Sequence, residues 1–164
     1  MKTKTTTELM LVSAASGDEI GTMRTLLREY QRSVDTDLCF QNFEQELAKL
    51  PGNYAPPDGR LLLGYANGLP AGCVAMRRLD AEIAEMKRLF VRPGYRGSGF
   101  GRVFAQAIID AARSQGYRRL VLDTLPGMRE AQALYAALGF REIGAYTDNP
   151  VAGTRFMGLE LASH

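Results

Sequence analysis

The chain has 164 residues, 46% apolar and 23% charged, with a net charge of +2, and this size and composition favour a single globular domain over residues 1–164. His164 is the sole histidine, and Cys39 and Cys73 are the two cysteines. This inventory excludes a catalytic histidine triad, a disulfide framework and metal sites built on these residue types, so we expect no metal. No apolar run approaches the roughly 20 residues that span a membrane, so we expect a cytoplasmic protein.

The first half of the chain alternates between strand and helix patterns. Apolar residues recur at helical spacing from Ile20 to Tyr30, Pro51 ends a second helix, and Asn67-Gly68 is typical of a hairpin turn. In chain order we predict a strand over Glu8–Ala15, a helix from Asp18, a short helix over about Phe40–Leu50, a loop over Gly52–Arg60, and strands over Leu61–Ala66, Gly72–Leu79 and Glu82–Arg92.

The second half continues the alternation. We predict a helix from Val103 to near Gly116, a buried strand over Leu120–Asp123, a helix over Ala131–Leu138 and strands over Phe140–Tyr146 and Arg155–Leu161. Gly139 follows the last helix in the usual position of a C-terminal cap. The order βααβββαβαββ predicts an α/β fold with a mixed, mostly antiparallel sheet and helices on both of its faces.

Positive charge is concentrated in the middle of the chain. Residues 77–119 hold ten basic and four acidic side chains, whereas the rest of the chain holds ten basic and fourteen acidic ones. The surplus indicates either an anionic ligand bound by this segment or an ordinary solvated surface. Nucleic acid is the less favoured ligand, because no long basic run is interleaved with aromatic residues.

A glycine-rich segment, Arg96-Gly97-Ser98-Gly99-Phe100-Gly101-Arg102, connects a predicted strand to a predicted helix. Glycines let the backbone approach a ligand, and the first helical turn offers unpaired N–H groups, so the segment could cradle a phosphate. The alternative is a tight turn before the helix. The dinucleotide fingerprint fails because Arg102 replaces its third glycine, and the Walker pattern fails because Phe100 follows Gly99 where lysine is required.

The spacing that does fit is Arg96-x-x-Gly99-x-Gly101, which resembles the pyrophosphate-binding loop of the GNAT superfamily of N-acyltransferases. Three more segments resemble that family in the expected order: Glu85–Val91 its preceding strand, Leu120–Thr124 its following strand, and Ala131-x-x-Leu134-Tyr135-x-x-x-Gly139-Phe140 its last helix–strand junction. The resemblance implies an N-acetyltransferase with acetyl-CoA as donor and an amine as acceptor.

In that family, coenzyme A lies where two neighbouring parallel strands splay apart. The residues expected to bind it by resemblance are the backbone of Leu89, Phe90 and Val91 for the pantetheine arm, and Arg96, Gly97, Ser98, Gly99, Phe100, Gly101 and Arg102 for the pyrophosphate. Many relatives carry an asparagine seven residues before the tyrosine of the last helix, where it contacts the pantetheine arm. This chain has Met128 there, so the contact is absent or is replaced by Thr124.

The chemistry needs a neutral amine, and alkyl amines have pKa values near 10.4, so a proton must be removed. With no internal histidine, a carboxylate is the natural base. Glu85 resembles the glutamate base of the histone-acetylating branch of the superfamily. Glu82 and a water molecule are the alternative bases, and a structural ion pair with a neighbouring arginine is the other interpretation of Glu85. Which face Glu85 occupies depends on whether its strand alternates strictly or contains a bulge.

Two more roles follow from the resemblance. Tyr135 matches the family tyrosine that protonates the departing thiolate of coenzyme A, although core packing would also explain an aromatic residue there. A backbone N–H of the Leu89–Val91 segment would meet the oxyanion that develops on the thioester carbonyl.

The acceptor is expected on the side of the sheet opposite coenzyme A. The candidate residues all lie in predicted loops or at their edges: Asp35, Asp37, Tyr54, Tyr146, Asp148 and Asn149. The aspartates would suit a cationic amine, but loop aspartates are also common turn formers. Two other functions stay open, a non-catalytic acyl-CoA sensor and an acetyltransferase for a protein or tRNA-linked amine, and the oligomeric state stays open between monomer and homodimer.

Overall fold

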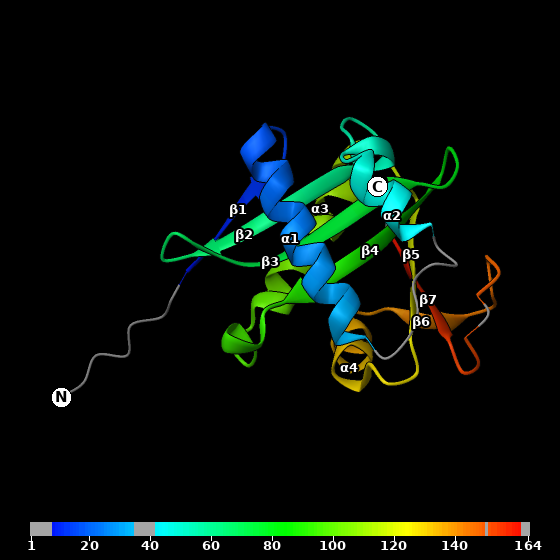
Figure 1. The fold of residues 1–164 in the computed structure, drawn as a ribbon. Coiled ribbons are helices and arrows are strands. Elements are labelled where there is room, and N and C mark those ends of the chain that lie inside the picture. The colour runs from blue at the N-terminus through cyan, green and yellow to red at the C-terminus, as the bar shows by residue number, and fades with distance from the viewer. Residues whose placement is uncertain (1–7, 35–41, 150, 162–164) are drawn as a thin grey trace.

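The computed structural model of the protein describes residues 8–34, 42–149 and 151–161. Its elements in chain order are β1 (Leu9–Ser13), α1 (Gly17–Ser33), α2 (Phe43–Ala48), the 3₁₀ helix η2 (Gly52–Tyr54), β2 (Arg60–Ala66), β3 (Leu69–Arg78), β4 (Ile83–Val91), the 3₁₀ helix η3 (Pro93–Tyr95), α3 (Phe100–Gln115), β5 (Arg119–Thr124), α4 (Arg129–Ala137), β6 (Arg141–Ile143) and β7 (Arg155–Glu160). The predicted order βααβββαβαββ is confirmed (Figure 1). Asp35, Asp37, Cys39 and His164 lie outside the described residues. Within those residues no helix is long and apolar enough to cross a bilayer.

The seven strands of the described residues form one sheet in the order β1-β2-β3-β4-β5-β7-β6. Neighbouring strands are antiparallel except β4 and β5, which are parallel and pair over Ile83–Glu85 with Arg119–Val121. Beyond this stretch β4 continues to Val91 and β5 to Thr124, and the two strands no longer pair with each other. This separation is the predicted splay, and it leaves the β5-facing edge of β4 free to bind another extended chain.

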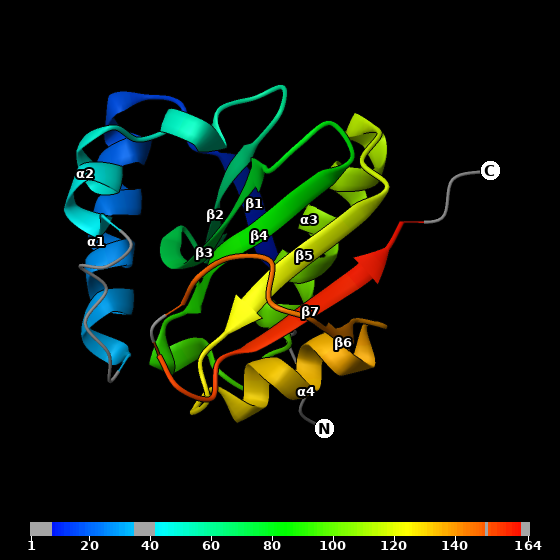
Figure 2. The ribbon, with the colours of Figure 1, turned by 90° about the vertical axis from the view of Figure 1, so that its right-hand side faces the viewer.

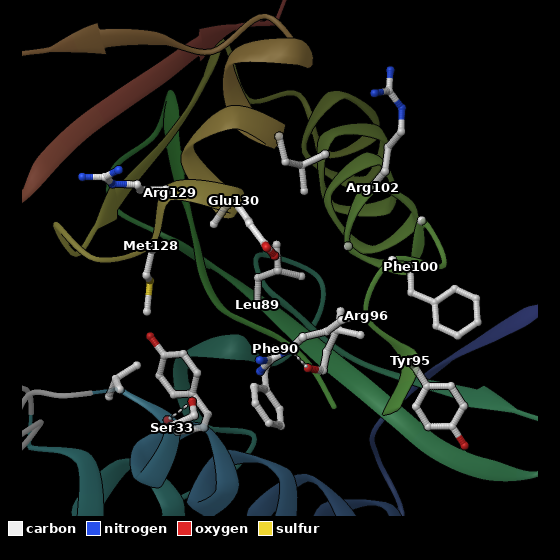
Figure 3. Close-up of a pocket in the computed structure, with 18 of the residues that line it drawn as sticks. Ser33, Leu89, Phe90, Tyr95, Arg96, Phe100, Arg102, Met128, Arg129 and Glu130 are labelled. Carbon is white, nitrogen blue, oxygen red and sulfur yellow. Dashed lines mark hydrogen bonds between the residues drawn. The ribbon is translucent and has the colours of Figure 1, made fainter. Parts of the chain in front are cut away.

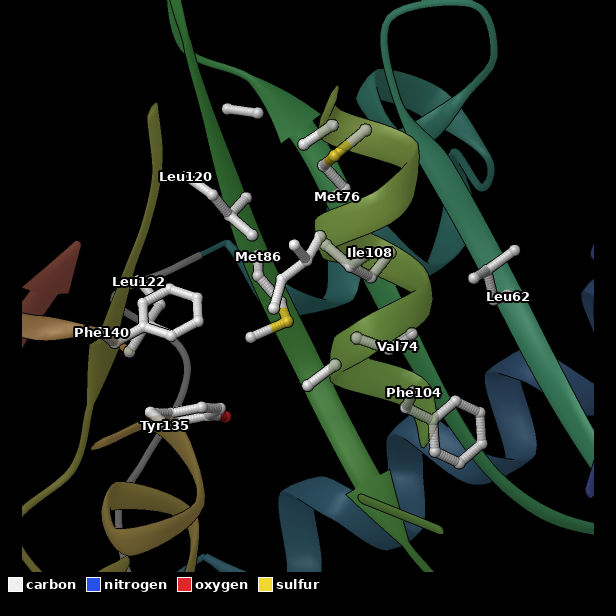
Figure 4. Close-up of a cluster of buried hydrophobic side chains, with 14 of the residues drawn as sticks. Leu62, Val74, Met76, Met86, Phe104, Ile108, Leu120, Leu122, Tyr135 and Phe140 are labelled. Atoms are coloured by element: carbon white, nitrogen blue, oxygen red, sulfur yellow. The ribbon is translucent and has the colours of Figure 1, made fainter. Parts of the chain in front are cut away.

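Helices cover both faces of the sheet, as predicted: α1 and α2 lie on one face, and α3 and α4 on the other (Figures 1 and 2). The α3-face cluster of buried apolar side chains fills the space between the sheet and α3, with Phe104, Ile108, Leu120 and Leu122 at its centre (Figure 4). A second buried cluster, on the α1 face, joins α1 and α2 to β2, β3 and β4. The two clusters thus pack the two faces of the sheet.

Local sequence explains where the two long helices begin. Ser16 caps α1, because its hydroxyl accepts the Glu19 N–H at 3.2 Å while the Glu19 carboxylate accepts the Ser16 N–H at 3.0 Å. Gly99 precedes α3 with a left-handed φ of +87° and provides no side-chain cap. The first N–H groups of α3 are therefore left without the capping partner that α1 has.

A bulge interrupts β4 beside the splay. Opposite Cys73–Ala75 of β3, the strand uses one extra residue over Lys87–Phe90, and Arg88 has a φ of +62°, which is unusual for a residue with a side chain. Met86 packs in the α3-face cluster before the bulge, and Leu89 packs against the same cluster after it. Strict alternation along this strand, one of the two interpretations open from the sequence, is therefore wrong.

The last hairpin differs from the prediction. The strand expected over Phe140–Tyr146 is confined to β6, because its pairing with β7 ends at Ile143 opposite Phe156. The chain then crosses over β4 and β5 before it returns as β7 (Figure 2). Tyr146 lies in this crossing segment and not in a strand, which places it on the α1 face of the sheet beside Glu85.

Candidate active site

A pocket of about 720 Å³, here the donor pocket, lies between α1, β4 and the N-terminal ends of α3 and α4 (Figure 3). Every residue predicted to bind coenzyme A lines it except Ser98, whose hydroxyl donates to the Tyr95 carbonyl. The predicted residues that line it are Leu89, Phe90, Val91, Arg96, Gly97, Gly99, Phe100, Gly101 and Arg102. Sequence segments spaced along β4 and the glycine loop thus meet at one cavity.

The glycine loop presents backbone N–H groups to the donor pocket. Gly97 and Gly99 have left-handed φ angles of +84° and +87°, and a Cβ at either position would meet no atom within 4 Å. The backbone conformation therefore requires glycine at both positions, and the missing side chains leave open space for a ligand. The N–H groups of Phe100, Gly101 and Arg102 begin α3 and have no acceptor within the helix. Such a helix start suits a phosphate.

Most of the basic residues in the central segment are paired with carboxylates. Ion pairs join Arg77 to Glu85, Arg78 to Asp58, Arg88 to Glu46, Arg92 to Glu29, Arg113 to Asp110, Arg118 to Glu82 and Arg119 to Glu160, and Lys87 lies 4.0 Å from Glu85 in a longer pair. Arg96 and Arg102 form no ion pair within the described part of the chain, and both line the donor pocket. The charge surplus of the segment thus narrows to two guanidinium groups beside the glycine loop, where an anionic ligand would use them.

A second pocket, here the inner pocket, opens where β4 and β5 separate and has a volume of about 60 Å³. It adjoins the donor pocket, because Tyr30, Leu89, Met128 and Ala131 line both. Its other lining residues are Met86, Lys87, Arg88, Asp123, Thr124, Leu125, Tyr135 and Asn149. The two cavities are therefore neighbours, one beside the glycine loop and the other at the splay of β4 and β5.

Tyr135 stands at the inner pocket with its hydroxyl available. The side chain is buried, packs on Phe140 and points from α4 toward β4 (Figure 4). No hydrogen bond among the described residues involves its hydroxyl. Burial, with smaller contributions from Tyr30 and Asp123, raises the pKa of Tyr135 above its ordinary value. The phenol therefore keeps its proton at neutral pH and can donate it.

Glu85 is fully buried and lines neither pocket. Its Oε1 accepts from Arg77 Nε at 2.7 Å and its Oε2 accepts from the Tyr146 hydroxyl at 2.5 Å. Burial and the neighbouring Glu85 carboxylate raise the pKa of Tyr146. The alternative base, Glu82, is exposed and pairs with Arg118 at 3.6 Å, away from both pockets.

The bulge of β4 is anchored by a buried ion pair. Arg88 Nε and Nη2 each donate to the Glu46 carboxylate of α2 at 2.9 Å, and the Arg88 side chain is 3% exposed. The guanidinium also lies 5.1 Å from the Phe43 ring centre and 6.0 Å from that of Tyr30. These contacts hold the strained backbone at Arg88 and so orient Leu89 toward the donor pocket.

Several other predicted or unforeseen residues take definite places. Tyr54 is buried beneath α2 and lines neither pocket, whereas Asp35 and Asp37 lie outside the described residues. Lys87 and Asp123, which the sequence did not single out for a role, both line the inner pocket. The Thr124 hydroxyl is buried there with no hydrogen-bond partner in the described structure.

A model of the acetyltransferase (GNAT) family matches residues 20–140. The chain belongs to this family. An uncharacterised N-acetyltransferase of Schizosaccharomyces pombe is 36% identical over 146 residues, which are 88% of this chain and 90% of the relative. Among solved structures, an acetyltransferase of Streptococcus agalactiae superposes with a TM-score of 0.78 at 21% identity, covering 93% of this chain and 98% of the other.

A second solved structure, a GNAT acetyltransferase of Elizabethkingia anophelis with acetyl-CoA bound, has a TM-score of 0.69 at 20% identity and covers 93% of this chain and 98% of its own. At these identities the structural matches establish the GNAT fold. Together with the family match they make this chain a GNAT enzyme, an acyl-CoA-dependent N-acetyltransferase. Its described residues contain no group of three or more side chains suited to hold a metal ion.

Proposed function

We propose that this GNAT enzyme transfers the acetyl group of acetyl-CoA to a small primary amine by direct attack of the amine on the thioester. The observation that carries the proposal is that the two pockets share lining residues, with the glycine loop in the donor pocket and Tyr135 in the inner pocket. A chain that only bound an anion would need the loop alone. The buried phenol at the narrow junction supports a reaction there.

The donor pocket fits acetyl-CoA in size, charge and backbone geometry. Its pyrophosphate would rest on the N–H groups of Phe100, Gly101 and Arg102, with Arg96 and Arg102 nearby. The open space beside Gly97 and Gly99 is available for phosphate oxygens. When bound, acetyl-CoA supplies an activated acyl thioester.

The pantetheine arm would bind the free edge of β4. Leu89, Phe90 and Val91 follow the end of the β4–β5 pairing, so their edge facing β5 can hydrogen-bond an extended ligand in the manner of an added strand. A backbone N–H of this segment would also stabilise negative charge that develops on the thioester carbonyl. Met128 lacks the amide of many relatives, and the unpartnered Thr124 hydroxyl is the group that could take over its contact.

We assign the two proton transfers to Tyr135 and to Glu85. Tyr135 donates its proton to the departing thiolate, consistent with its raised pKa and unpartnered hydroxyl. Glu85 receives the proton of the acceptor ammonium through Tyr146, which passes its own proton to Glu85 along their 2.5 Å hydrogen bond. The amine nitrogen bonds to the acetyl carbon as the carbon–sulfur bond breaks, and the products are an acetamide, coenzyme A thiol and one proton.

The covered acceptor side favours a small amine over a polypeptide. The segment between β6 and β7 crosses β4 and β5 on that side (Figure 2), and it is tied down by Tyr146 to Glu85 and by Asn149 to Asp123. The inner pocket beneath this segment has a volume of about 60 Å³, which is room for only a small acceptor. A cytoplasmic location is part of the same proposal, and the buried Cys73, which is a free thiol, is consistent with a reducing compartment.

The test is a panel of small amines, peptides with free N-termini and lysine peptides, each incubated with acetyl-CoA and followed by thiol release. We expect turnover with small amines and at least about 100-fold less with Tyr135→Phe, within the usual contribution of a general acid. Turnover confined to peptides would replace the acceptor in this proposal. Tight acetyl-CoA binding with no turnover on any member would make the chain a sensor.

A further inference from the structure

The inner pocket is lined by two opposite charges that the fold pairs weakly or not at all. Lys87 Nζ lies 4.0 Å from Glu85 Oε1, a long ion pair, and Asp123 forms no ion pair with a described residue. On the α1 face of the sheet, Arg77 is paired with Glu85, and Arg88 is paired with Glu46. Lys87 on β4 shares the Glu85 carboxylate only at 4.0 Å, and it lines the inner pocket from the side of the splay opposite Asp123 on β5. Buried charges are normally paired, so two complementary ones facing a cavity indicate a ligand that carries both signs.

Lys87 has donors that nothing described in the protein accepts. Its side chain is 11% exposed, and its nearest carboxylate oxygen, Glu85 Oε1, is 4.0 Å away and already bonded to Arg77 at 2.7 Å. None of the hydrogen bonds among the described residues involves its ammonium, which has three N–H donors. Burial lowers the pKa of Lys87. A carboxylate in the inner pocket would satisfy these donors and offset the burial of the charge.

Asp123 is held in place and has acceptor capacity to spare. Its Oδ2 accepts from Asn149 Nδ2 at 3.2 Å, and the Asn149 amide is itself oriented because its Oδ1 accepts the Val151 N–H at 3.0 Å. Asp123 forms no ion pair with any described residue. Its second oxygen can therefore accept from an ammonium group that enters the pocket.

We infer that the acceptor is a small amino acid, a primary amine with a carboxylate a few bonds away. Lys87 binds the carboxylate, and Asp123 holds the amine beside the thioester. The inference rests on the proposed acetyl transfer and names its substrate class. The volume agrees, because about 60 Å³ holds roughly four to six water-sized groups at about 10–15 Å³ each, the size of an amino acid head group and not of a peptide.

Matched acceptors test the inference directly. The series runs from glycine through β-alanine to 4-aminobutyrate, with several L-α-amino acids, each beside its own carboxamide, which keeps the amine and removes the negative charge. We expect kcat/KM to be about 10- to 150-fold higher for the amino acids accepted by the enzyme than for their amides, the range of a charged hydrogen bond. Most of the difference should lie in KM, because the carboxylate is held alike before and during the reaction.

Variants separate charge recognition from folding. Lys87→Met should reduce the preference for carboxylate over amide to near unity, and Lys87→Arg should restore part of it. Lys49→Met, a change of an exposed lysine on another element, should leave the wild-type preference intact. Acetyl-CoA affinity, measured by calorimetry, should be unchanged by Lys87→Met, since Lys87 does not line the donor pocket.

The outcomes distinguish this inference from the proposed function. Acetylation of amides as fast as of their amino acids, or an unchanged preference in a folded Lys87→Met protein, would overturn the amino acid as acceptor and leave acetyl transfer standing. No acetylation of any amine in the series or in the wider panel would overturn both.

Discussion

Glu46→Ala should damage both stability and turnover, although Glu46 lines neither pocket. The substitution removes the partner of Arg88 and leaves a guanidinium group that is 3% exposed without its two 2.9 Å hydrogen bonds. Arg88 occupies the left-handed backbone conformation of the β4 bulge. The loss therefore acts on the segment that presents Leu89 to the donor pocket.

The magnitude follows from the burial of the pair. Breaking a buried ion pair from one side costs about 3–5 kcal/mol. The rings of Phe43 and Tyr30 stay beside the guanidinium at 5.1 and 6.0 Å, and cation–π contacts of this kind keep up to about 2 kcal/mol. We therefore expect the low end, about 3 kcal/mol, which for a domain of this size lowers Tm by roughly 6–12 °C.

The assay pairs thermal unfolding with acetyl-CoA turnover, and Glu44→Ala is the matched control. Glu44 lies on the same helix and pairs with Arg28, but the two side chains are 64% and 49% exposed, so its loss should cost no more than about 1 kcal/mol. At temperatures below the melting range, we expect Glu46→Ala to lower kcat/KM markedly and Glu44→Ala to leave it unchanged. A Tm equal to that of Glu44→Ala, or full activity in a destabilised Glu46→Ala protein, would refute the anchoring of the bulge by this pair.

Three further changes test the site. Tyr135→Phe should lower kcat about 100- to 10,000-fold and leave acetyl-CoA affinity unchanged. Because burial raises the pKa of Tyr135, loss of its proton should not lower the wild-type kcat at saturation below about pH 10. A Tyr135→Phe variant with wild-type kcat would show that Tyr135 is not the general acid. Glu85→Gln should lower kcat/KM by a similar factor, whereas Glu82→Gln, which changes the exposed partner of Arg118, should have no effect. Equal kcat/KM values for the two variants would eliminate Glu85 as the base. Gly99→Ala places a side chain at a φ of +87°, so the free loop should relax to another conformation and acetyl-CoA would have to restore the strained one. Acetyl-CoA affinity should then fall about 5- to 30-fold, the equivalent of roughly 1–2 kcal/mol. Gly94→Ala, without a left-handed φ and outside the pocket, should bind normally in the same titration.

Local patterns in the sequence predicted the parts of the fold that depend on short-range order. Helical spacing located α1 and α3, and the Asn67-Gly68 turn located the β2–β3 hairpin. The glycine loop connects β4 to α3 as predicted, and it lines the donor pocket. The bulge at Arg88 could be raised only as an alternative, because it depends on pairing with β3 and on Glu46 from a distant helix. Such contacts leave no periodic signal along the chain.

The acceptor side was predicted less well for the same reason. Tyr146 was expected in a strand, yet its place is set by a hydrogen bond to Glu85, 61 positions away. Lys87 and Asp123 lie on different strands and face one cavity only because β4 and β5 are parallel neighbours that separate after Glu85. The sequence signals available for them were the alternation that grouped Lys87 with Glu85 and the position of Asp123 near the carboxyl end of its strand. Neither signal fixes a role without the sheet order.

The central claim is that the two pockets carry out one acetyl transfer. The most direct test incubates the protein with acetyl-CoA labelled in the acetyl group and an accepted amino acid, and measures coenzyme A thiol and labelled N-acetyl product by mass spectrometry in the same sample. The account predicts equal amounts of thiol and product at all times, and a large drop in both with Tyr135→Phe. Thiol released without N-acetylated product, or labelled acetyl-CoA retained intact in the presence of every amine, would contradict it.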